Sequence, residues 1–404
     1  MSIHLDPDKC VGCSACVVHC PVAQATPKFL GPRLSGPALE RMRLLGVHDD
    51  PSLTYCANCK NCEIACPHNV PIATINMLAR QAQAKETPPS FRDWICAHGE
   101  VIANLTKYIP AGLKNWSIKQ GFVRQSLDFI GIAKQCPMPS FAQIPFREHI
   151  RKISQTQTGK AVIFFPGCYI NYYDPGTGFD LVAILQACDY QVYVPEEFVC
   201  CGIPLISGGF EDDARHNAIQ NAKTIAKYAN QGLPIITACP SCRLMLTTES
   251  PEFFPEVAND LSKAKIYPAE DFILQLIATS ELNLRGLKRD ETLDCIYHAP
   301  CHLRAQGEGL PGYELLSQLP GINMTLANAG CCGISGSYGF KKEKYAIGQM
   351  VGHNLFQTIN DSPAKYVATE CGTCRLQISA ATKKPVLHPL TLVRAILEQK
   401  SLAY

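Results

Sequence analysis

Two adjacent cysteines followed by a glycine occur twice in this chain, in VCCGIP at 199–204 and in GCCGIS at 330–335. Each pair belongs to a set of five cysteines. Cys301 lies 133 residues after Cys168, and Cys371 lies 132 residues after Cys239. Offsets this uniform indicate one domain that has been duplicated. We define the first CCG set and the second CCG set as Cys168, Cys200, Cys201, Cys239 and Cys242, and as Cys301, Cys331, Cys332, Cys371 and Cys374.

The cysteines of both sets follow apolar runs that are typical of β-strands. Three runs end on the first set (KAVIFFPGC, YQVYVPEEFVCC, LPIITACPSC) and three on the second (LDCIYHAPC, INMTLANAGCC, AKYVATECGTC). Helical stretches such as residues 212–230 lie between them, so each copy is predicted to be a parallel α/β unit with short strands. Because ligands gather at the carboxyl ends of parallel strands, the five thiols of each set are expected to converge.

Five convergent thiols exceed the four ligands of a tetrahedral zinc ion and suit a polynuclear iron–sulfur centre. Neighbouring side chains in extended backbone point apart, so a Cys-Cys pair faces one cluster only through a sharp turn, or by binding two of its metal atoms. The glycine after each pair allows such a turn. The alternatives are a vicinal disulfide or two ordinary buried thiols.

A different pattern, C-x2-C-x2-C-x3-C-P, occurs at residues 10–21 and again at 56–67. Three thiolates at this spacing bind three irons of one cubane, and the fourth cysteine, followed by proline, binds the other cluster. The pattern therefore predicts two [4Fe–4S] clusters. Two zinc sites are the alternative, although zinc usually takes separate pairs of ligands. We define the first N-terminal set as Cys10, Cys13, Cys16 and Cys66, and the second N-terminal set as Cys56, Cys59, Cys62 and Cys20.

The chain has 404 residues, 22 of them cysteines, and a formal net charge of +2. Its first residues, MSIHLDPDKC, lack the basic and apolar regions of a signal peptide. We therefore expect a cytoplasmic, reducing compartment, where clustered cysteines are more often metal ligands than disulfides. No apolar run approaches the ~18 residues of a membrane-spanning helix. The nearly balanced charge indicates no nucleic-acid partner.

The segment from 91 to 160 carries no cysteine motif and is predicted to be largely helical. Between 101 and 160 it has nine Lys and Arg residues and two acidic residues, together with Trp116, Phe122 and Phe129. A basic, aromatic and amphipathic segment suits the surface of an anionic membrane. The two other interpretations are a docking surface for another subunit and a plain linker.

Several residues near the sets have open roles. His298 and His302 flank Cys301. They either act on a cluster, as ligands, hydrogen-bond donors or proton carriers, or lie at a polar strand end without such a role. His19 and His68 are predicted to be solvated, as is the basic stretch GFKKEKY at 339–345, for which a quinone or partner site is the alternative. Four cysteines fall outside the sets, and one of them is predicted to lie in the core (Cys188; the others are Cys96, Cys136 and Cys295).

Together these residues resemble a known superfamily. The spacings C-x31-C-C-G-x36-C-x2-C and C-x29-C-C-G-x37-C-x2-C resemble the cysteine-rich CCG domain of heterodisulfide reductases and of iron–sulfur subunits for glycolate, lactate and glycerol-3-phosphate oxidation. In this comparison Cys295 is the alternative to Cys301. The N-terminal part resembles the helical two-cluster ferredoxin domain of succinate dehydrogenase. The domain order, with stretches such as FFPGCYINYYDP and CCGIPLISGGF, is most similar to the iron–sulfur subunits of anaerobic glycerol-3-phosphate dehydrogenases.

The resemblance implies an α/β fold with a helical ferredoxin domain at 1–90, a linker or docking segment at 91–160, a first CCG domain at 161–285 and a second at 286–404. It implies two cubane [4Fe–4S] clusters in the N-terminal sets and two noncubane [4Fe–4S] clusters in the CCG sets. No dinucleotide-binding glycine motif follows a predicted strand, so neither flavin nor NAD is expected on this chain.

The function that we expect is electron transfer. By the resemblance, a flavin-dependent dehydrogenase partner oxidises the organic substrate, and electrons pass through this chain to a membrane quinone or another acceptor. The chain would then lie peripherally on the inner face of the cytoplasmic membrane. The alternatives are a catalytic subunit that reduces a disulfide at a CCG cluster, an iron–sulfur subunit of a glycolate or lactate oxidase, and a structural zinc protein.

Overall fold

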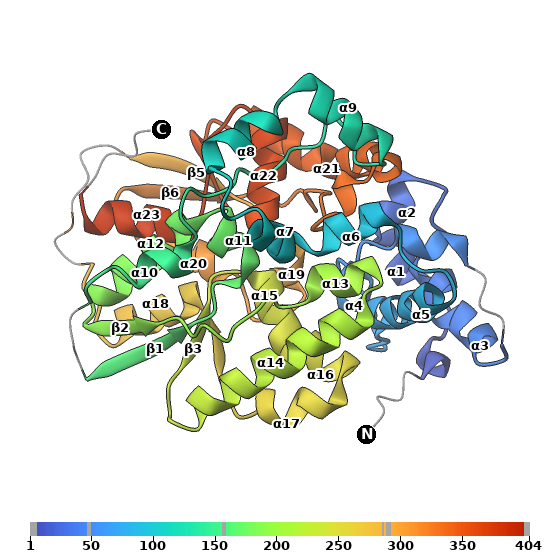
Figure 1. The fold of residues 1–404 in the computed structure, drawn as a ribbon, viewed down its shortest axis with the longest axis horizontal. Helices are drawn as coiled ribbons and strands as arrows, with labels where there is room; N and C mark the ends of the chain where they lie inside the picture. The colour runs from blue at the N-terminus through green and yellow to red at the C-terminus, as the bar shows by residue number, and fades with distance from the viewer. Residues whose placement is uncertain (1–5, 47–49, 156–158, 285–286, 288–291, 400–404) are drawn as a thin grey trace.

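The computed structural model describes residues 6–46, 50–155, 159–284, 287 and 292–399. The expected boundary between the two CCG domains, at 285 and 286, lies outside these residues. The N-terminal part is helical (Figure 1, blue). Its longest helix, α5, buries Ile72 and Ile75 against the cysteine loops. The elements are η1 (Pro7–Lys9), α1 (Ala15–Val18), α2 (Pro21–Ala25), η2 (Leu34–Ala38), α3 (Leu39–Arg43), η3 (Pro51–Tyr55), α4 (Asn61–Ile64) and α5 (Ile72–Glu86).

The middle segment folds into short helices, in agreement with the helical expectation. α6 begins with a capping box, in which the Ser90 and Asp93 side chains each accept a hydrogen bond from the other residue's backbone N–H. Beyond α9, Ile132 forms an antiparallel bridge with Lys341 of the second copy. The segment is therefore packed on the protein. Its helices are α6 (Phe91–Ala97), α7 (Gly99–Leu105), α8 (Ala111–Ser117), α9 (Gly121–Phe129) and α10 (Phe146–Ile150).

Two four-stranded parallel sheets follow, with the equivalent strand orders β2-β1-β3-β4 and β6-β5-β7-β8. Each sheet has one strand more than the three apolar runs predicted, because β4 and β8 are too short to give a clear pattern. The strands are β1 (Lys160–Phe164), β2 (Tyr190–Tyr193), β3 (Ile235–Thr237), β4 (Ile266–Pro268), β5 (Leu293–Tyr297), β6 (Ile322–Leu326), β7 (Tyr366–Ala368) and β8 (Val386–Leu387).

Helices connect the parallel strands, as crossover connections require. The first copy contains the predicted helix near 212–230 as α14, whose first turn carries three acidic residues that favour a helix N-terminus. The helices of the first copy are α11 (Gly167–Tyr172), α12 (Pro175–Gln186), α13 (Ile203–Gly208), α14 (Glu211–Ala229), α15 (Pro240–Leu244), η4 (Met245–Glu249), α16 (Ser250–Phe253), η5 (Pro255–Val257), α17 (Ala258–Leu261) and α18 (Ala269–Ala278). Those of the second are α19 (Cys301–Arg304), α20 (Pro311–Ser317), η6 (Tyr338–Phe340), α21 (Lys342–Asp361), α22 (Gly372–Ala381) and α23 (Pro389–Leu397).

The two copies share a hydrophobic core, which includes Phe164 of the first sheet and Tyr297 of the second. Across their boundary, Arg394 of α23 forms an ion pair with Asp180 of α12 at 3.1 Å. In Figure 1, the helices that follow β1, β3 and β5 lie between the sheets and the N-terminal helices. The carboxyl ends of both sheets therefore face the N-terminal part. The predicted α/β architecture, with a helical N-terminal part and a duplicated parallel sheet, is confirmed.

Candidate iron–sulfur centres

The first N-terminal set comes together near the surface. Its cysteines line one small pocket together with Arg33 (Cys10, Cys13, Cys16 and Cys66). Burial, followed by the neighbouring thiols of Cys10, Cys66 and Cys13, raises the pKa of Cys16. Cys66 belongs to the second motif of the sequence. The structure therefore places the fourth cysteine of one motif beside three of the other, which is the exchange that the spacing predicts.

The second N-terminal set also contains the exchanged cysteine, and it is buried except for the half-buried Cys59. Burial raises the pKa of Cys20 to about 11, and the Cys56 thiol contributes to this rise. Cys20 and Cys56 in turn raise the pKa of Cys59, after burial and the charge of Cys331. Arg80 is buried beside Cys56 and places a positive charge next to the set. This set therefore differs from the first in both depth and charge.

The first CCG set forms where the order of its sheet reverses. Cys168 follows β1 in α11, and Cys239 follows β3 at the start of α15. Cys168 Sγ lies 3.6 Å from Cys200 Sγ. The predicted strand that runs to Cys200 is shorter than expected, because β2 ends at Tyr193 and a loop carries the chain onward. Gly202 adopts a φ of +99°, which provides the expected turn after the pair.

The second CCG set is assembled in the same way. Cys332 Sγ lies 3.1 Å from Cys374 Sγ, and the Cys331 thiol interacts with that of Cys301. The alternative ligand Cys295 instead lies in β5, within the core. Gly333 has a φ of +84°, and a Cβ at this residue would lie 1.9 Å from a backbone oxygen of α21. The second turn is therefore held against a helix and has no space for a side chain.

The four sets have the chemistry that iron–sulfur clusters require. Each brings four or five sulfur atoms together, as a polynuclear cluster does. Burial raises the pKa of Cys59 and Cys62, so such thiols release their protons when a cationic centre binds. Among the described residues, no disulfide joins Cys200 to Cys201 or Cys331 to Cys332. Thus the residues fit the clusters; the individual ligands and the number and type of clusters stay predictions.

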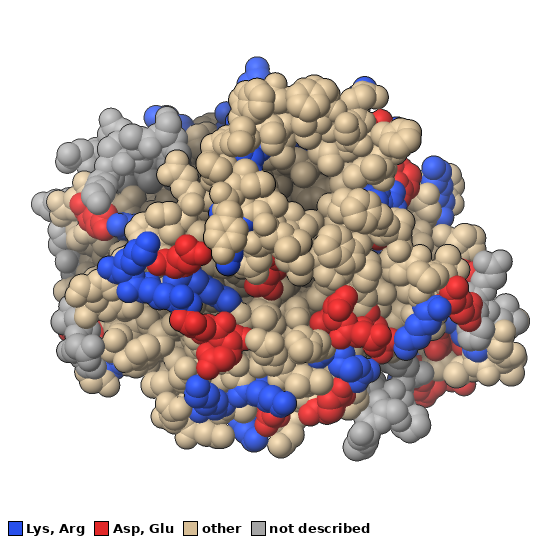
Figure 2. Space-filling view, in the orientation of Figure 1, with Lys and Arg blue, Asp and Glu red and all other residues tan. Residues whose placement is uncertain are grey.

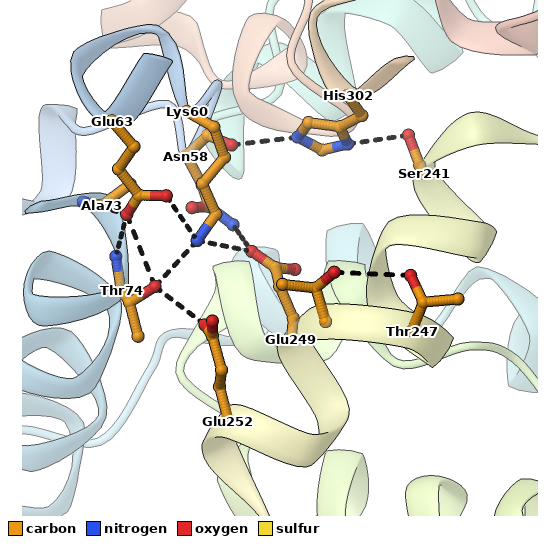
Figure 3. A network of polar contacts seen from close by, with 11 residues as sticks. Asn58, Lys60, Glu63, Ala73, Thr74, Ser241, Thr247, Glu249, Glu252 and His302 are labelled. Carbon is orange, nitrogen blue, oxygen red and sulfur yellow. Dashed lines mark hydrogen bonds and ion pairs between the residues drawn. The ribbon is translucent and has the colours of Figure 1, made fainter. Parts of the chain in front are cut away.

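His302 joins three of the cysteine loops (Figure 3). One ring nitrogen lies 2.9 Å from Ser241 Oγ, between two cysteines of the first CCG set. The other lies 2.9 Å from the backbone oxygen of Asn58, within the second N-terminal set. His302 itself follows Cys301 of the second CCG set. Of the roles left open, the structure gives this histidine hydrogen bonds to the loops and, among the described residues, none to a sulfur atom.

Next to this junction, the buried Lys60 attaches the N-terminal part to the first copy (Figure 3). Its Nζ lies 3.3 Å from Glu63, 3.4 Å from Glu249 and 2.8 Å from Thr74 Oγ1. Burial opposes its charged form, but Glu249 and Glu63 raise its pKa overall. Asn58 donates a further hydrogen bond to Glu249 at 2.9 Å. This buried ionic contact therefore attaches the cysteine loop that carries Lys60 to the first CCG copy.

A cavity of about 750 Å³ lies beside the first CCG set. It is lined by all five cysteines of that set but only by Cys371 of the second, and helices α6 and α7 form part of its wall. Glu100 of α7 accepts the backbone N–H of Cys200 at 2.6 Å, and Arg147 also lines the cavity. Burial, followed by the charge of Cys200, raises the pKa of Glu100 to about 7.

These lining residues were missed from the sequence because no motif marks them. Glu100 and Arg147 are separated from the cysteines by long stretches of chain. The only signal was the basic and aromatic composition of the middle segment, which did not indicate contact with a particular set. Tertiary packing brings this segment over the first CCG set.

One expectation outside the sets is wrong. The stretch 339–345 is not a solvated turn, because Lys341 and Lys344 are 5% and 3% exposed and α21 begins within it. Lys341 pairs with Asp93 at 2.6 Å, and Lys344 donates to the backbone oxygen of Thr54. The stretch therefore fastens the second copy to the middle segment and the N-terminal part. The expectations for three other residues agree with the structure, since His19 and His68 are exposed and Cys188 is buried in the core.

Two known domain families match this chain. The cysteine-rich domain family matches residues 162–247 and 295–379. The 4Fe-4S dicluster domain family matches residues 6–70. The three matched regions contain all the cysteines of the four sets.

Whole-chain comparisons give relatives with the same organisation. The chain is 36% identical over 397 residues to the C subunit of anaerobic glycerol-3-phosphate dehydrogenase from Escherichia coli (strain K12), with 96% of this chain and 98% of the relative covered. It is 26% identical to the B subunit of fumarate reductase (CoM/CoB) from Methanothermobacter marburgensis, covering 98% of this chain and 72% of the relative. Lactate utilization protein A of Bacillus pumilus is 29% identical, over 54% of this chain and 90% of the relative.

Proposed function

Because the chain belongs to the family of the C subunit of anaerobic glycerol-3-phosphate dehydrogenase, we propose that it is the iron–sulfur electron-transfer subunit of a dehydrogenase of that type. It receives electrons from a flavin-dependent partner, which oxidises the substrate, and delivers them to a membrane quinone. Bound iron–sulfur clusters supply one-electron transfer. The residues of this chain hold the clusters, set their surroundings and provide the exit site.

The observation that carries this proposal is that each of the four cysteine sets adjoins another, from the first N-terminal set near the surface to the first CCG set at the cavity. The first N-terminal set adjoins the second, since Cys16 contributes to the raised pKa of Cys20. The second N-terminal set adjoins the second CCG set, since the charge of Cys331 raises the pKa of Cys59. The two CCG sets adjoin through the His302–Ser241 contact and the shared cavity. Such an order suits a route from the surface to a ligand cavity.

The cavity beside the first CCG set supports a small organic electron acceptor. Its volume of about 750 Å³ is within the range of small-molecule sites, which typically run to ~300–1,000 Å³. Its wall is largely apolar, with residues such as Ile118, Met138 and Phe141. Polar and charged side chains also line it, including Glu100 and Arg147. A largely apolar site with polar groups at defined places suits a quinone, whose ring is apolar and whose oxygens accept hydrogen bonds.

The surface of the middle segment supports peripheral contact with a membrane. Trp116, Phe122 and Phe129 on α8 and α9 are 57%, 69% and 91% exposed. This part of the surface is largely uncharged in Figure 2, and basic side chains accompany it (Lys107, Lys114, Lys119 and Arg124). Aromatic and basic side chains together favour an anionic lipid surface. Among the described residues, no helix is long and apolar enough to cross a membrane.

The acceptor site is tested with the full chain, purified anaerobically and reduced with dithionite. Reoxidation of its clusters by menadione is followed by stopped-flow absorbance. Ser207→Trp fills the cavity and is expected to slow reoxidation by about tenfold or more, because a loss of ~1.4 kcal/mol of binding corresponds to that factor. Ser317→Trp is the control, since Ser317 is exposed and does not line the cavity. Equal slowing by both variants would contradict the proposal, and reoxidation by a disulfide but not by menadione would favour the heterodisulfide reductase alternative.

Membrane contact is tested separately by flotation with vesicles that contain anionic lipid. The triple variant W116S/F122S/F129S is expected to stay with the free protein while the parent floats. If both float equally, the segment serves another purpose, and the acceptor test is unaffected.

A further inference from the structure

His298 has an unusual position at the carboxyl end of β5. Its side chain is 1% exposed, and neither ring nitrogen has a hydrogen-bond partner among the described residues. Only its backbone is fixed, through donation to the oxygen of Ala368 at 2.9 Å. An imidazole buried without partners is costly, and buried polar groups almost always have one. The free nitrogens therefore indicate a ligand at this place.

The side chain faces the second CCG set. A ring nitrogen of His298, Cys332 Sγ and Cys374 Sγ all lie within 4.8 Å of one another. The two sulfur atoms are 3.1 Å apart. A neutral imidazole has one ring nitrogen with a lone pair that can bind a metal. Two thiolates and a neutral imidazole around one point are ligands that iron accepts.

Among the described residues, no unpartnered histidine faces the first CCG set, since His98 near Cys200 has both ring nitrogens hydrogen-bonded, to Trp94 and Asp213. The residue in the same place, three before Cys168, is Phe165, whereas His298 is three before Cys301. Phe165 is fully buried and packs edge-on against Phe198 at 4.9 Å between ring centroids. A phenyl ring offers no ligand atom. The two copies therefore differ at one position that points toward their cysteines, although all five cysteines are present in each.

We propose that His298 is an iron ligand of the centre held by the second CCG set, which it would bind through one ring nitrogen on the side of Cys332 and Cys374. A neutral nitrogen ligand adds no negative charge, so the second centre is expected to have a higher reduction potential than it would with a thiolate there. The inference requires only that the second CCG set holds iron. It does not depend on the identity of the electron donor, the acceptor or the membrane surface.

The test uses the full chain, purified anaerobically from cells supplied with ¹⁵N-labelled histidine. Pulsed EPR is recorded at the potential where the second centre is paramagnetic, and its signal is identified by its loss in Cys331→Ser. We expect a directly bound nitrogen in the parent and none in His298→Phe, which carries the residue of the first copy. His302→Gln is the matched control and keeps the nitrogen signal, because His302 already has two hydrogen-bond partners away from sulfur.

The variant His298→Cys separates the loss of a nitrogen ligand from the loss of the whole site. It offers a thiolate, so the centre is expected to keep its iron, lose the nitrogen coupling and move to a lower midpoint potential. A centre without an EPR signal is examined by Mössbauer spectroscopy of the ⁵⁷Fe-enriched chain. We expect the spectral parameters of one iron to differ between the parent and His298→Cys. The inference is overturned if the parent shows no bound nitrogen and if its Mössbauer spectrum is the same as that of His298→Cys. Persistence of the coupling in His298→Phe, or zinc in place of iron at this set, would overturn it as well.

Discussion

The two CCG copies share a strand order and five cysteines, yet the space around their cysteines is different. The first set lines a cavity of about 750 Å³, beside Glu100 and Arg147 of the middle segment. The second set is more enclosed, with the buried His298 on one side and Gly333 packed against α21 on another, and only its Cys371 lines the cavity. The duplicated domain thus provides two similar scaffolds, of which the first is bordered by the middle segment at a cavity and the second is closed mainly by residues of its own copy. We infer that exchange with an acceptor belongs to the first copy and internal electron transfer to the second.

The largest expected difference between the copies appears when the glycine after each Cys-Cys pair, Gly202 or Gly333, is replaced by alanine. A Cβ at Gly333 would lie 1.9 Å from the backbone oxygen of Gly348, whereas at Gly202 the nearest atom is the flexible end of Met245, at 3.4 Å. Gly202→Ala carries only the strain of its positive φ, about 1–3 kcal/mol. Gly333→Ala adds a clash with a helix and is expected to cost more than ~4 kcal/mol.

Apparent melting temperature and iron content after anaerobic purification measure this difference. Gly333→Ala is expected to lose the iron of one centre or the folded chain, and Gly202→Ala to keep its iron. Similar behaviour of the two variants would show that the second copy is no more tightly enclosed than the first.

The next effect concerns how the N-terminal part is attached to each copy. On the first copy it uses the buried Lys60, which lies 3.4 Å from Glu249. On the second its contacts include the neutral hydrogen bond from Ser335 Oγ to the backbone oxygen of Ala57, besides the contact of Lys344 with Thr54. Lys60→Met leaves a buried carboxylate without its partner, which costs about 3–5 kcal/mol. Ser335→Ala removes one hydrogen bond, worth about 1 kcal/mol.

Urea denaturation of the two variants, followed by tryptophan fluorescence and by cluster absorbance, gives the ranking. A larger destabilisation by Ser335→Ala would mean that the second copy is the main anchor of the N-terminal part.

The smallest effect is on the potential of the first centre. The pKa of Glu100 is raised to about 7, chiefly by burial. Above this pH the carboxylate is negative, favours the oxidised form of the adjoining centre and lowers its midpoint potential; below it the neutral acid does not. Glu100→Gln is expected to remove this dependence and raise the midpoint at pH 8.5 by up to about 60 mV, a tenfold effect for one electron.

An EPR-monitored redox titration at pH 6 and pH 8.5 tests this point. The centre is assigned by the loss of its signal in Cys200→Ser, and the second centre is the internal reference because Glu100 contacts only the first set. A parallel shift of both centres would assign the pH dependence to another group.

Much of this organisation was predictable because cysteine spacing is local. The two repeats, the parallel sheets and the exchange between Cys20 and Cys66 follow from motifs of a few residues each. The buried state of Lys341 and Lys344 was not predictable, because a basic stretch usually lies in solvent and only distant partners such as Asp93 hold it inside. For the same reason no sequence pattern connected Glu100 with Cys200, because the two residues are 100 positions apart in the chain.

By itself, the sequence determined that the CCG domain occurs twice, because the strand and cysteine pattern repeats, and it predicted which thiols form the four sets, because a cluster needs its ligands at fixed spacings. Only the tertiary structure decided which set adjoins which, that α6 and α7 leave a cavity at the first CCG set, and that His298 faces the second while Phe165 takes its place in the first. These features depend on contacts between segments far apart in the chain, whose geometry is set by packing of the whole core and not by any local pattern.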